Sequence, residues 1–151
     1  TGLNLTLYYK DFDFSAMFQG AFDVDGYYMA EAAYAFYNGA NALKRHLDRW
    51  TTEHHNASYP RITKDSQTNF TTSSFWLQNA SYVRLKTISL GYNLPNSFLS
   101  KLGVQKAKLY VAGENLLTFS DLEGIDPEEG NERGWSYGNV KKVSIGLKVS
   151  F

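Results

Sequence analysis

Five segments of the chain alternate apolar and polar residues with the two-residue period of a β-strand, and this pattern constrains the fold more than any other feature. These segments are residues 3–9, 12–22, 82–92, 106–114 and 143–151. In each of them one face is apolar, while the other is polar without being uniformly charged. Aromatic residues, which favour strands, make up 16% of the chain. The sequence therefore predicts an all-β fold.

One of the five segments changes phase along its length. Val83 and Leu85 share one phase of the alternation, whereas Ile88 and Leu90 take the other. A single extra residue in a strand produces such a change, so the pattern predicts a β-bulge near residues 86–87.

The connections between the five segments differ greatly in length. The first is a tight turn at residues 10–11 and the third is of medium length, whereas residues 23–81 and 118–139 are long excursions. Long loops are uncommon in compact domains, but short and long connections alternate in up-and-down transmembrane barrels, where the long ones are extracellular. The spacing predicts an antiparallel up-and-down transmembrane β-barrel with two long extracellular loops and an inward-running last strand.

The last segment has the features of a membrane strand. A spanning strand needs ~9–11 tilted residues, and apolar residues recur at every second position up to an aromatic terminus. A soluble protein rarely ends in this way, because an unpaired terminal edge promotes aggregation. The pattern resembles the signal that outer-membrane assembly machinery reads on bacterial barrel proteins. Its residues are Val143, Ile145, Leu147, Val149 and Phe151.

Composition excludes several classes of function. The formal net charge is zero, which argues against a nucleic-acid surface. The absence of cysteine removes disulfide frameworks, thiolate metal sites and cysteine nucleophiles. The mean hydropathy of −0.39 is typical of soluble proteins, yet the alternation of a barrel strand halves its apolar signal. The chain opens directly into a strand without an initiator Met, so either a signal was removed or the sequence begins inside a longer chain.

Several motifs occur together in a fixed order along nearly the whole chain. They are YYKDFD (8–13), DRWT (48–51), YPR (59–61), SYVRLK (81–86), LGYNLP (90–95), LYVAGENLLTF (109–119), GIDPE (124–128) and the terminal strand. As a set they resemble the SusC/RagA-type TonB-dependent outer-membrane transporters. The chain departs from the family at residues 54–56, where His-His-Asn replaces an Asn-Pro-Asn-like stretch.

The resemblance implies a bacterial outer-membrane protein with a 22-stranded barrel and an N-terminal plug in its lumen. Residues 1–151 would be the C-terminal part, supplying the last five strands without the plug or the segment that contacts TonB. The resemblance also implies import of glycan fragments or peptides together with a SusD-like surface lipoprotein. No enzymatic activity, cofactor or metal is expected, and the lipid bilayer would cover the outer face of the strands.

The resemblance and the alternation together assign roles to individual side chains. Inward-facing charges would contact the plug or the wet lumen; they are Glu114, Lys106, Lys108, Lys142 and Lys148. Aromatic rings on the external segments could stack on ligand, contact the lipoprotein lid or pack the loops together. These rings are Trp50, Tyr59, Trp76, Trp135 and Tyr137.

Other chemistry has weaker support. His54 and His55 stand beside Glu53, but the HExxH spacing of a zinc site is missing, so a solvated loop pair is favoured. An acidic loop lacks the regular spacing of a calcium site and is interpreted as a solvated face; it comprises Asp121, Glu123, Asp126, Glu128, Glu129 and Glu132. No Gly-x-Ser-x-Gly elbow is present, which disfavours a hydrolase.

Two questions stay open at the level of sequence. Residues 27–37 could extend the second strand above the membrane, whereas residues 40–50 are predicted to form a short Ala-rich helix. The principal alternative to the barrel segment is a soluble, secreted carbohydrate-binding β-sandwich module, whose strands also alternate.

Overall fold

A computed structural model describes residues 1–63, 68–129 and 133–151. The chain divides into two compact units. The first, here called the strand unit, contains residues 1–23, 81–121 and 139–151; the second, the loop unit, contains residues 24–80 and 122–138. No helix among the described residues is long and apolar enough to cross a membrane.

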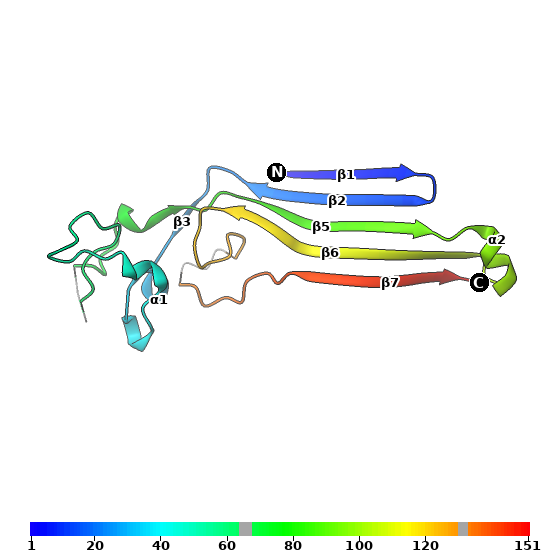
Figure 1. Cartoon of the computed structure of the whole chain (residues 1–151). Coiled ribbons are helices and arrows are strands. Elements are labelled where there is room, and N and C mark those ends of the chain that lie inside the picture. Colours follow the sequence, from blue (N-terminus) through cyan, green and yellow to red (C-terminus); the bar gives the residue numbers. More distant parts are fainter. Residues whose placement is uncertain (64–67, 130–132) are drawn as a thin grey trace. The chain divides into compact units, whose positions relative to one another are not determined.

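The strand unit is one antiparallel sheet of five strands (Figure 1). Its strands are β1 (Gly2–Tyr9), β2 (Phe12–Ala21), β5 (Tyr82–Asn93), β6 (Lys106–Ser120) and β7 (Lys142–Ser150). Their order in the sheet is β1-β2-β5-β6-β7, so each strand pairs with the one that follows it in this unit. The five predicted strands and their up-and-down order are confirmed. Strand β6 is longer than predicted and extends to Ser120.

The two shorter connections and the C-terminus lie at the same end of this sheet (Figure 1). Strands β1 and β2 join through a turn in which Lys10 has a φ of 52°. Strands β5 and β6 join through helix α2 (Asn96–Leu99) and the 3₁₀ turn η4 (Ser100–Leu102). The Asn93 amide donates to the Asp11 carbonyl at 2.8 Å, and the Gln105 amide donates to the Ser150 carbonyl at 3.0 Å. The two long excursions leave from the opposite end, as the alternation of connection lengths predicts.

The predicted bulge is present in β5. Pairing of β5 with β2 and with β6 passes from Leu85 directly to Thr87 and leaves Lys86 without a register partner. Strand β6 accommodates the bulge at Asn115, whose φ is 52°. The extra residue returns Ile88 to the face that Leu85 occupies, which explains the change of phase in the sequence.

The register aligns the five strands into one apolar and one polar face. Directly paired residues share a face, so each transverse row belongs to one face of the sheet. One apolar row contains Leu7, Phe14, Leu90, Val111 and Ile145, and one polar row contains Asn4, Met17, Thr87, Glu114 and Lys142. A slip of one residue would exchange the faces of a strand, so this pattern fixes the register.

The loop unit contains short elements around an aromatic core. Strands β3 (Asp25–Tyr27) and β4 (Leu77–Asn79) form a two-stranded sheet. The other elements are helix α1 (Ala30–Ala33) and the 3₁₀ turns η1 (Tyr37–Gly39), η2 (Lys44–Leu47) and η3 (Ser74–Trp76). The core cluster consists of Tyr28, Ala33, Tyr34 and Trp76.

Both predictions for residues 27–50 require correction. The extended conformation ends at Tyr27, because Ala30 adopts a φ of 50° and begins α1. The expected helix over 40–50 is reduced to η2, with Leu43 in extended backbone before it. Tertiary contacts override the helical propensity of residues 40–50, since Arg45 donates to the Glu123 carbonyl and His46 to the Ala33 carbonyl.

Candidate functional site

The loop unit holds together through aromatic rings rather than through regular structure. Tyr34 packs edge-on against Trp76 with ring centroids 5.1 Å apart, and lies 4.6 Å from Phe70. Burial raises the pKa of the Tyr34 phenol. Trp76 is only 4% exposed, so its ring packs inside the loop unit and offers little surface to a ligand. Such pairs add about 0.5–1.5 kcal/mol each beyond their buried area.

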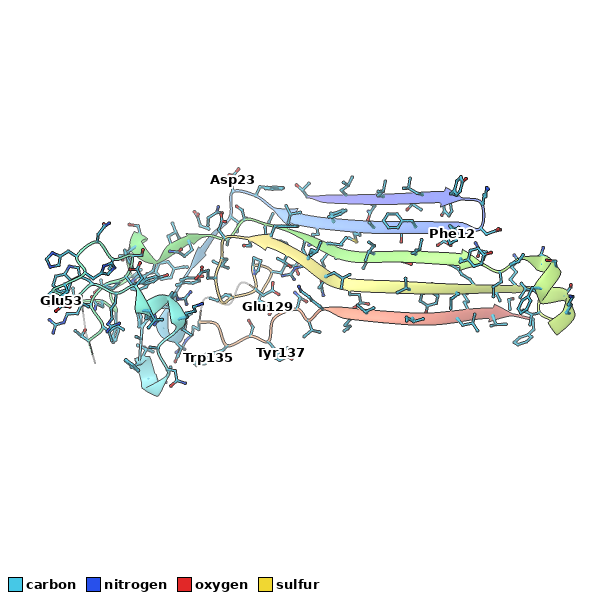
Figure 2. The ribbon with its side chains drawn as sticks, in the orientation of Figure 1. Phe12, Asp23, Glu53, Glu129, Trp135 and Tyr137 are labelled. Carbon is cyan, nitrogen blue, oxygen red and sulfur yellow. The ribbon has the colours of Figure 1, made fainter. Side chains whose placement is uncertain are left out.

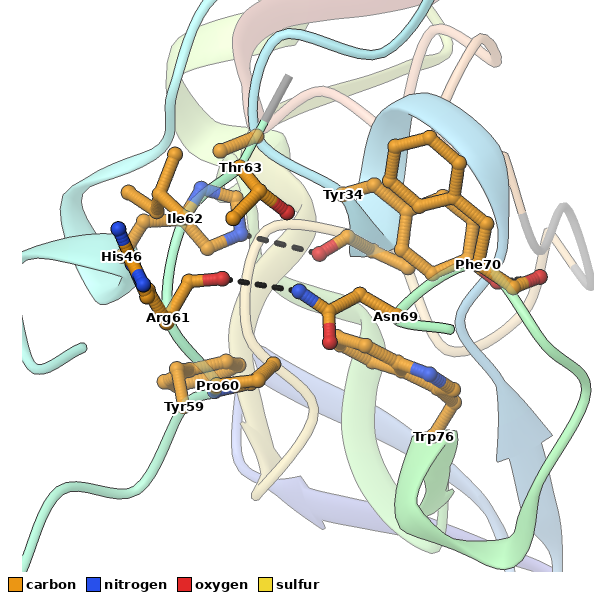
Figure 3. A pocket seen from close by; sticks show the side chains of 12 residues that line it. Tyr34, His46, Tyr59, Pro60, Arg61, Ile62, Thr63, Asn69, Phe70 and Trp76 are labelled. Atoms are coloured by element: carbon orange, nitrogen blue, oxygen red, sulfur yellow. Dashed lines mark hydrogen bonds between the residues drawn. The ribbon is translucent and has the colours of Figure 1, made fainter. Parts of the chain in front are cut away.

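A small cavity borders this aromatic core (Figure 3). Tyr59, Phe70 and Trp76 contribute to its wall, and the Asn69 amide donates to the Arg61 carbonyl at 2.8 Å across it. Its volume is about 30 Å³. That volume suits a single water molecule, whereas small-molecule sites measure roughly 300–1,000 Å³. The cavity is therefore a packing feature and not a ligand pocket.

The motifs DRWT and YPR are the two arms of a closed loop and are joined by a parallel β-bridge between Arg49 and Tyr59. The Trp50 amide donates to the Tyr59 carbonyl at 2.8 Å, and the Tyr59 amide donates to the Asp48 carbonyl at 3.0 Å. The Asp48 carboxylate accepts from the Ser58 amide at 3.0 Å and from His54 Nε2 at 2.8 Å. These hydrogen bonds lower the pKa of Asp48 to about 2, and the bond from Ser58 has the larger effect.

The two adjacent histidines of this loop serve different contacts. His54 binds Asp48, whereas the His55 ring stacks on Trp50 with an interplanar angle of 8° and centroids 5.4 Å apart. Within the part of the chain that the structure describes, no group of three or more His, Cys, Asp or Glu residues is placed to hold a metal ion. Glu132 of the acidic loop lies outside the described residues.

His46 is buried with both ring nitrogens satisfied. Nδ1 accepts a hydrogen bond from the Leu43 amide at 3.0 Å, and Nε2 donates to the Ala33 carbonyl at 3.0 Å. This network fixes the neutral tautomer with its proton on Nε2. Burial lowers the pKa of His46, against the opposing effect of the Ala33 carbonyl.

Residues 122–138 are fastened to residues 24–80 by polar contacts. The Tyr28 hydroxyl donates to the Glu123 carbonyl at 2.6 Å. The Arg45 guanidinium donates to the carbonyls of Glu123 and Ala32, and lies 4.4 Å above the Tyr28 ring. These contacts unite the two long excursions in one folded unit.

A second contact between the same segments is a bidentate ion pair. Arg133 donates to both carboxylate oxygens of Glu31 at 3.1 Å. Desolvation raises the pKa of Glu31, but hydrogen bonds from its own backbone and from Arg133 prevail and hold that pKa below its usual value. Arg133 also lies 4.0 Å from the centroid of the Trp135 ring.

The five predicted ligand or lid residues fall into two groups. Tyr59 and Trp76 line the small cavity and pack the loop unit internally. Trp50, Trp135 and Tyr137 are exposed, with 37%, 63% and 87% of their surfaces accessible; Figure 2 marks the last two. Arg45 was not among the predicted residues; it stands between Lys44 and His46, and no pattern in the sequence distinguishes it from the neighbouring charges.

The predicted inward charges share the polar face of the strand unit. Glu114 pairs with Lys142 at 3.4 Å, and Lys108 pairs with Asp13 at 2.6 Å. Asp13 was missing from the predicted set. Its ion pair crosses Gly91, where any Cβ would meet the Asp13 carboxylate and the end of the Lys108 side chain. The glycine of the LGYNLP motif thus leaves room for an ion pair that joins β2 to β6.

Comparisons with known proteins identify the family. No family model matches the chain. TonB-dependent receptor P3 of Formosa agariphila is 36% identical over 99% of the chain, and TonB-dependent receptor P26 of the same organism is 35% identical over 99%. The chain belongs to the TonB-dependent receptors. It spans 16% of the length of these two relatives.

A solved structure agrees with this assignment. The RagAB peptide importer in its open-open state matches the segment with a TM-score of 0.77 and 30% identity, over 99% of the segment and 17% of the solved chain. The predicted SusC/RagA-type resemblance is confirmed. The relatives are receptors and transporters rather than enzymes, and TonB-dependent receptors are outer-membrane proteins of Gram-negative bacteria.

Proposed function

We propose that the segment is the C-terminal part of the barrel wall of an outer-membrane nutrient importer. Residues 1–151 would form the last five strands of a 22-stranded barrel whose plug lies elsewhere in the protein. The observation that carries the proposal is the five-stranded antiparallel sheet, apolar along the whole of one face, which matches a solved importer over 99% of the segment.

The chemistry of the sheet supports this assignment. Ile145 is 79% exposed and Val143 70% exposed on the apolar face, an arrangement suited to hydrocarbon. Strands β1 and β7 each pair with one neighbour only, within the described residues. Bilayers do not tolerate open sheet edges, so both edges would pair with further strands of a closed barrel.

The cargo that we propose is peptide, with glycan fragments as the second candidate. RagAB, the solved relative, is a peptide importer. By analogy we infer a SusD-like surface lipoprotein as partner, and TonB as the source of energy through a region outside this segment. Trp50, Trp135 and Tyr137 are the residues that we propose for contact with ligand or lipoprotein, because their rings are exposed.

Uptake by intact cells tests the proposal. Cells that carry the full receptor and its lipoprotein should accumulate labelled oligopeptides, and deletion of TonB should abolish accumulation. Labelled oligosaccharides offered in parallel separate the two cargo classes. TonB-independent uptake, or no uptake of either class, would contradict the proposal.

Exposed rings of the loop unit provide a finer test. Replacing Trp135 and Tyr137 together with alanine should weaken binding of the oligopeptide or of the lipoprotein to the purified receptor, because both rings offer large accessible contact area. Leu47→Ala, at a side chain that is 73% exposed in the same unit, is the matched control. Equal affinities for the three proteins would remove both rings from the binding surface.

The assembly signal is tested at Phe151. Deletion of this residue in the full receptor should lower its outer-membrane level, because the apolar alternation through Val143 and Val149 would lose its terminal aromatic. Quantitative surface labelling checks the effect, with deletion of Asn56 in a loop as control. Unchanged surface abundance would contradict the signal.

A further inference from the structure

Asn38 and Gly39 follow one another in η1, at an exposed point of the loop unit. Asn38 has a φ of 49° and a ψ of 33°, and Gly39 has a φ of 79°, so both residues adopt left-handed backbone. Asn and Gly tolerate this conformation better than other residues do. A Cβ added at Gly39 would meet no heavy atom of the described residues within 4 Å. The peptide group between Asn38 and Gly39 therefore lies open to its surroundings.

The Asn38 side chain contacts an ion pair that holds the loop unit together. Its amide donates a hydrogen bond to the Glu31 carboxylate. The same carboxylate accepts two bonds of 3.1 Å from Arg133, whose guanidinium also lies 4.0 Å from the centroid of the Trp135 ring. The amide of Asn38 thus supports the contact between residues 24–80 and residues 122–138, and a carboxylate in its place would oppose that contact.

We propose that Asn38 is a site of spontaneous deamidation, and that its conversion loosens the contact between Glu31 and Arg133. The backbone nitrogen of Gly39 attacks Cγ of Asn38. The new N–Cγ bond closes a cyclic imide, the Cγ–Nδ2 bond breaks, and Nδ2 leaves as ammonia with the proton of the Gly39 amide. Water then opens the imide at either carbonyl, which gives aspartate or isoaspartate. A following glycine favours ring closure, because no Cβ hinders the approach of its nitrogen.

A second step of the chain offers the same ring closure in a different setting. Asp25 precedes Gly26, but both lie in β3, where they pair with Asn79 and Gln78 of β4. A Cβ added at Gly26 would stand 3.1 Å from the Cβ of Ala80. Ring closure requires rotation of the backbone, which a paired and crowded strand resists and an exposed three-residue turn permits. We therefore expect the imide to form at Asn38 and not at Asp25.

Conversion would change both the charge and the length of the turn. A carboxylate at position 38 cannot donate to Glu31, repels it, and competes with it for the guanidinium of Arg133. Isoaspartate also adds one carbon atom to the main chain of η1. Either product weakens the hold on Arg133 and exposes the bond between Arg133 and Gly134 to trypsin. This modification lies within the loop unit and is independent of the cargo class.

Ageing of the purified full receptor in warm neutral buffer tests the modification. Peptide mapping with electron-transfer fragmentation distinguishes asparagine, aspartate and isoaspartate at each position. We expect conversion at Asn38 to be several-fold faster than at Asn56, an exposed loop residue that precedes Ala57, and isoaspartate to be absent at Asp25. Asn38→Gln retains an amide but cannot close the five-membered ring, so it should suppress the signal. Conversion at Asn38 that is no faster than at Asn56 would overturn the proposal.

Limited trypsin digestion of the intact receptor tests the consequence. Asn38→Asp should be cut after Arg133 several-fold faster than the unaged wild type, whereas Asn38→Gln should be cut at the wild-type rate because its amide can still donate. In a Glu31→Gln background Asn38→Asp should add no further increase, since the carboxylate that it repels is gone. Equal cutting of the Asp and Gln variants at position 38 would show that Asn38 does not support the ion pair.

Discussion

Single residues set how closely the strands approach one another. Gly20 of β2 lies against β5, where an added Cβ would stand 2.6 Å from the Tyr82 carbonyl oxygen. At Gly91 the same change would meet only the ends of the Asp13 and Lys108 side chains, which can move aside. The backbone at Tyr82 cannot move aside in this way. A methyl group should therefore be tolerated less well at Gly20 than at Gly91.

Replacing Gly20 with alanine should therefore destabilise the receptor. The methyl group would separate β2 from β5 at a buried position, at a cost of about 1–3 kcal/mol. Gly2→Ala is the matched control, since its Cβ would lie 3.6 Å from the Phe18 carbonyl oxygen, an ordinary contact. Urea unfolding of the purified receptor in detergent measures the difference, and equal midpoints for the two variants would contradict the close approach.

The ionisation of His46 gives the loop unit a defined dependence on pH. Burial lowers its folded-state pKa below the ordinary 6.5. The unfolded state therefore binds the proton first as pH falls, and protonation would set a proton on Nδ1 against the Leu43 amide. The stabilisation by neutral His46 is complete above pH 6.5 and is lost as pH falls from 6.5 towards the folded-state pKa.

Hydrogen exchange of residues 43–47 should accelerate between pH 6.5 and 5 once corrected for the intrinsic rate. His46→Gln removes the titration while its amide can still accept from Leu43 and donate to Ala33. The variant should show corrected rates that are flat over this range. A pH dependence that persists in the variant would assign the effect to another group.

At the scale of elements, the bulge in β5 keeps one face apolar along a strand of 12 residues. Leu85 and Ile88 both lie on that face only because Lys86 is inserted between them. Without Lys86, the apolar residues before and after this point of β5 would lie on opposite faces of the sheet. Each face would then mix polar and apolar side chains.

Deletion of Lys86 should accordingly prevent assembly of the receptor. Ile88 and Leu90 would turn to the polar face, or the pairing of β5 with both neighbours would be lost. Outer-membrane level and heat-modifiable migration on gels measure the outcome, with deletion of Asn56 in the loop unit as the length-matched control. Normal assembly of the Lys86 deletion would show that the register is not fixed by this residue.

The sheet could be predicted from sequence because its constraint is periodic and local. Alternation identified all five strands and the bulge near Lys86, and the lengths of the connections gave their order. The loop unit carries no such period: residues 40–50 have helical propensity, yet contacts of Arg45 and His46 with residues distant in sequence decide their conformation. Asp13 was missed for the same reason, since its partner Lys108 lies 95 residues further along the chain.

At the scale of the whole molecule, the strand unit has one exposed apolar face and two edge strands that pair on one side only, among the described residues. Its apolar face leaves Ile145, Leu147 and Val143 more than half exposed, and β1 and β7 carry unpaired edges within the described sheet. A soluble sandwich would cover this face with a second sheet. The described residues outside the strand unit form the loop unit, which contains only the two short strands β3 and β4.

The uncovered apolar face predicts how residues 1–151 behave when they are expressed alone. Two open edges and a continuous apolar face favour association in water, so the segment should aggregate or require detergent. The soluble carbohydrate-binding module would instead give a monomer that unfolds cooperatively without detergent. Analytical ultracentrifugation followed by thermal unfolding in plain buffer distinguishes the two, and a stable soluble monomer would contradict the barrel segment.

Lys108→Ala offers a further check on the polar face. The substitution removes the ion pair with Asp13 and leaves the apolar face intact, so residues 1–151 should still require detergent.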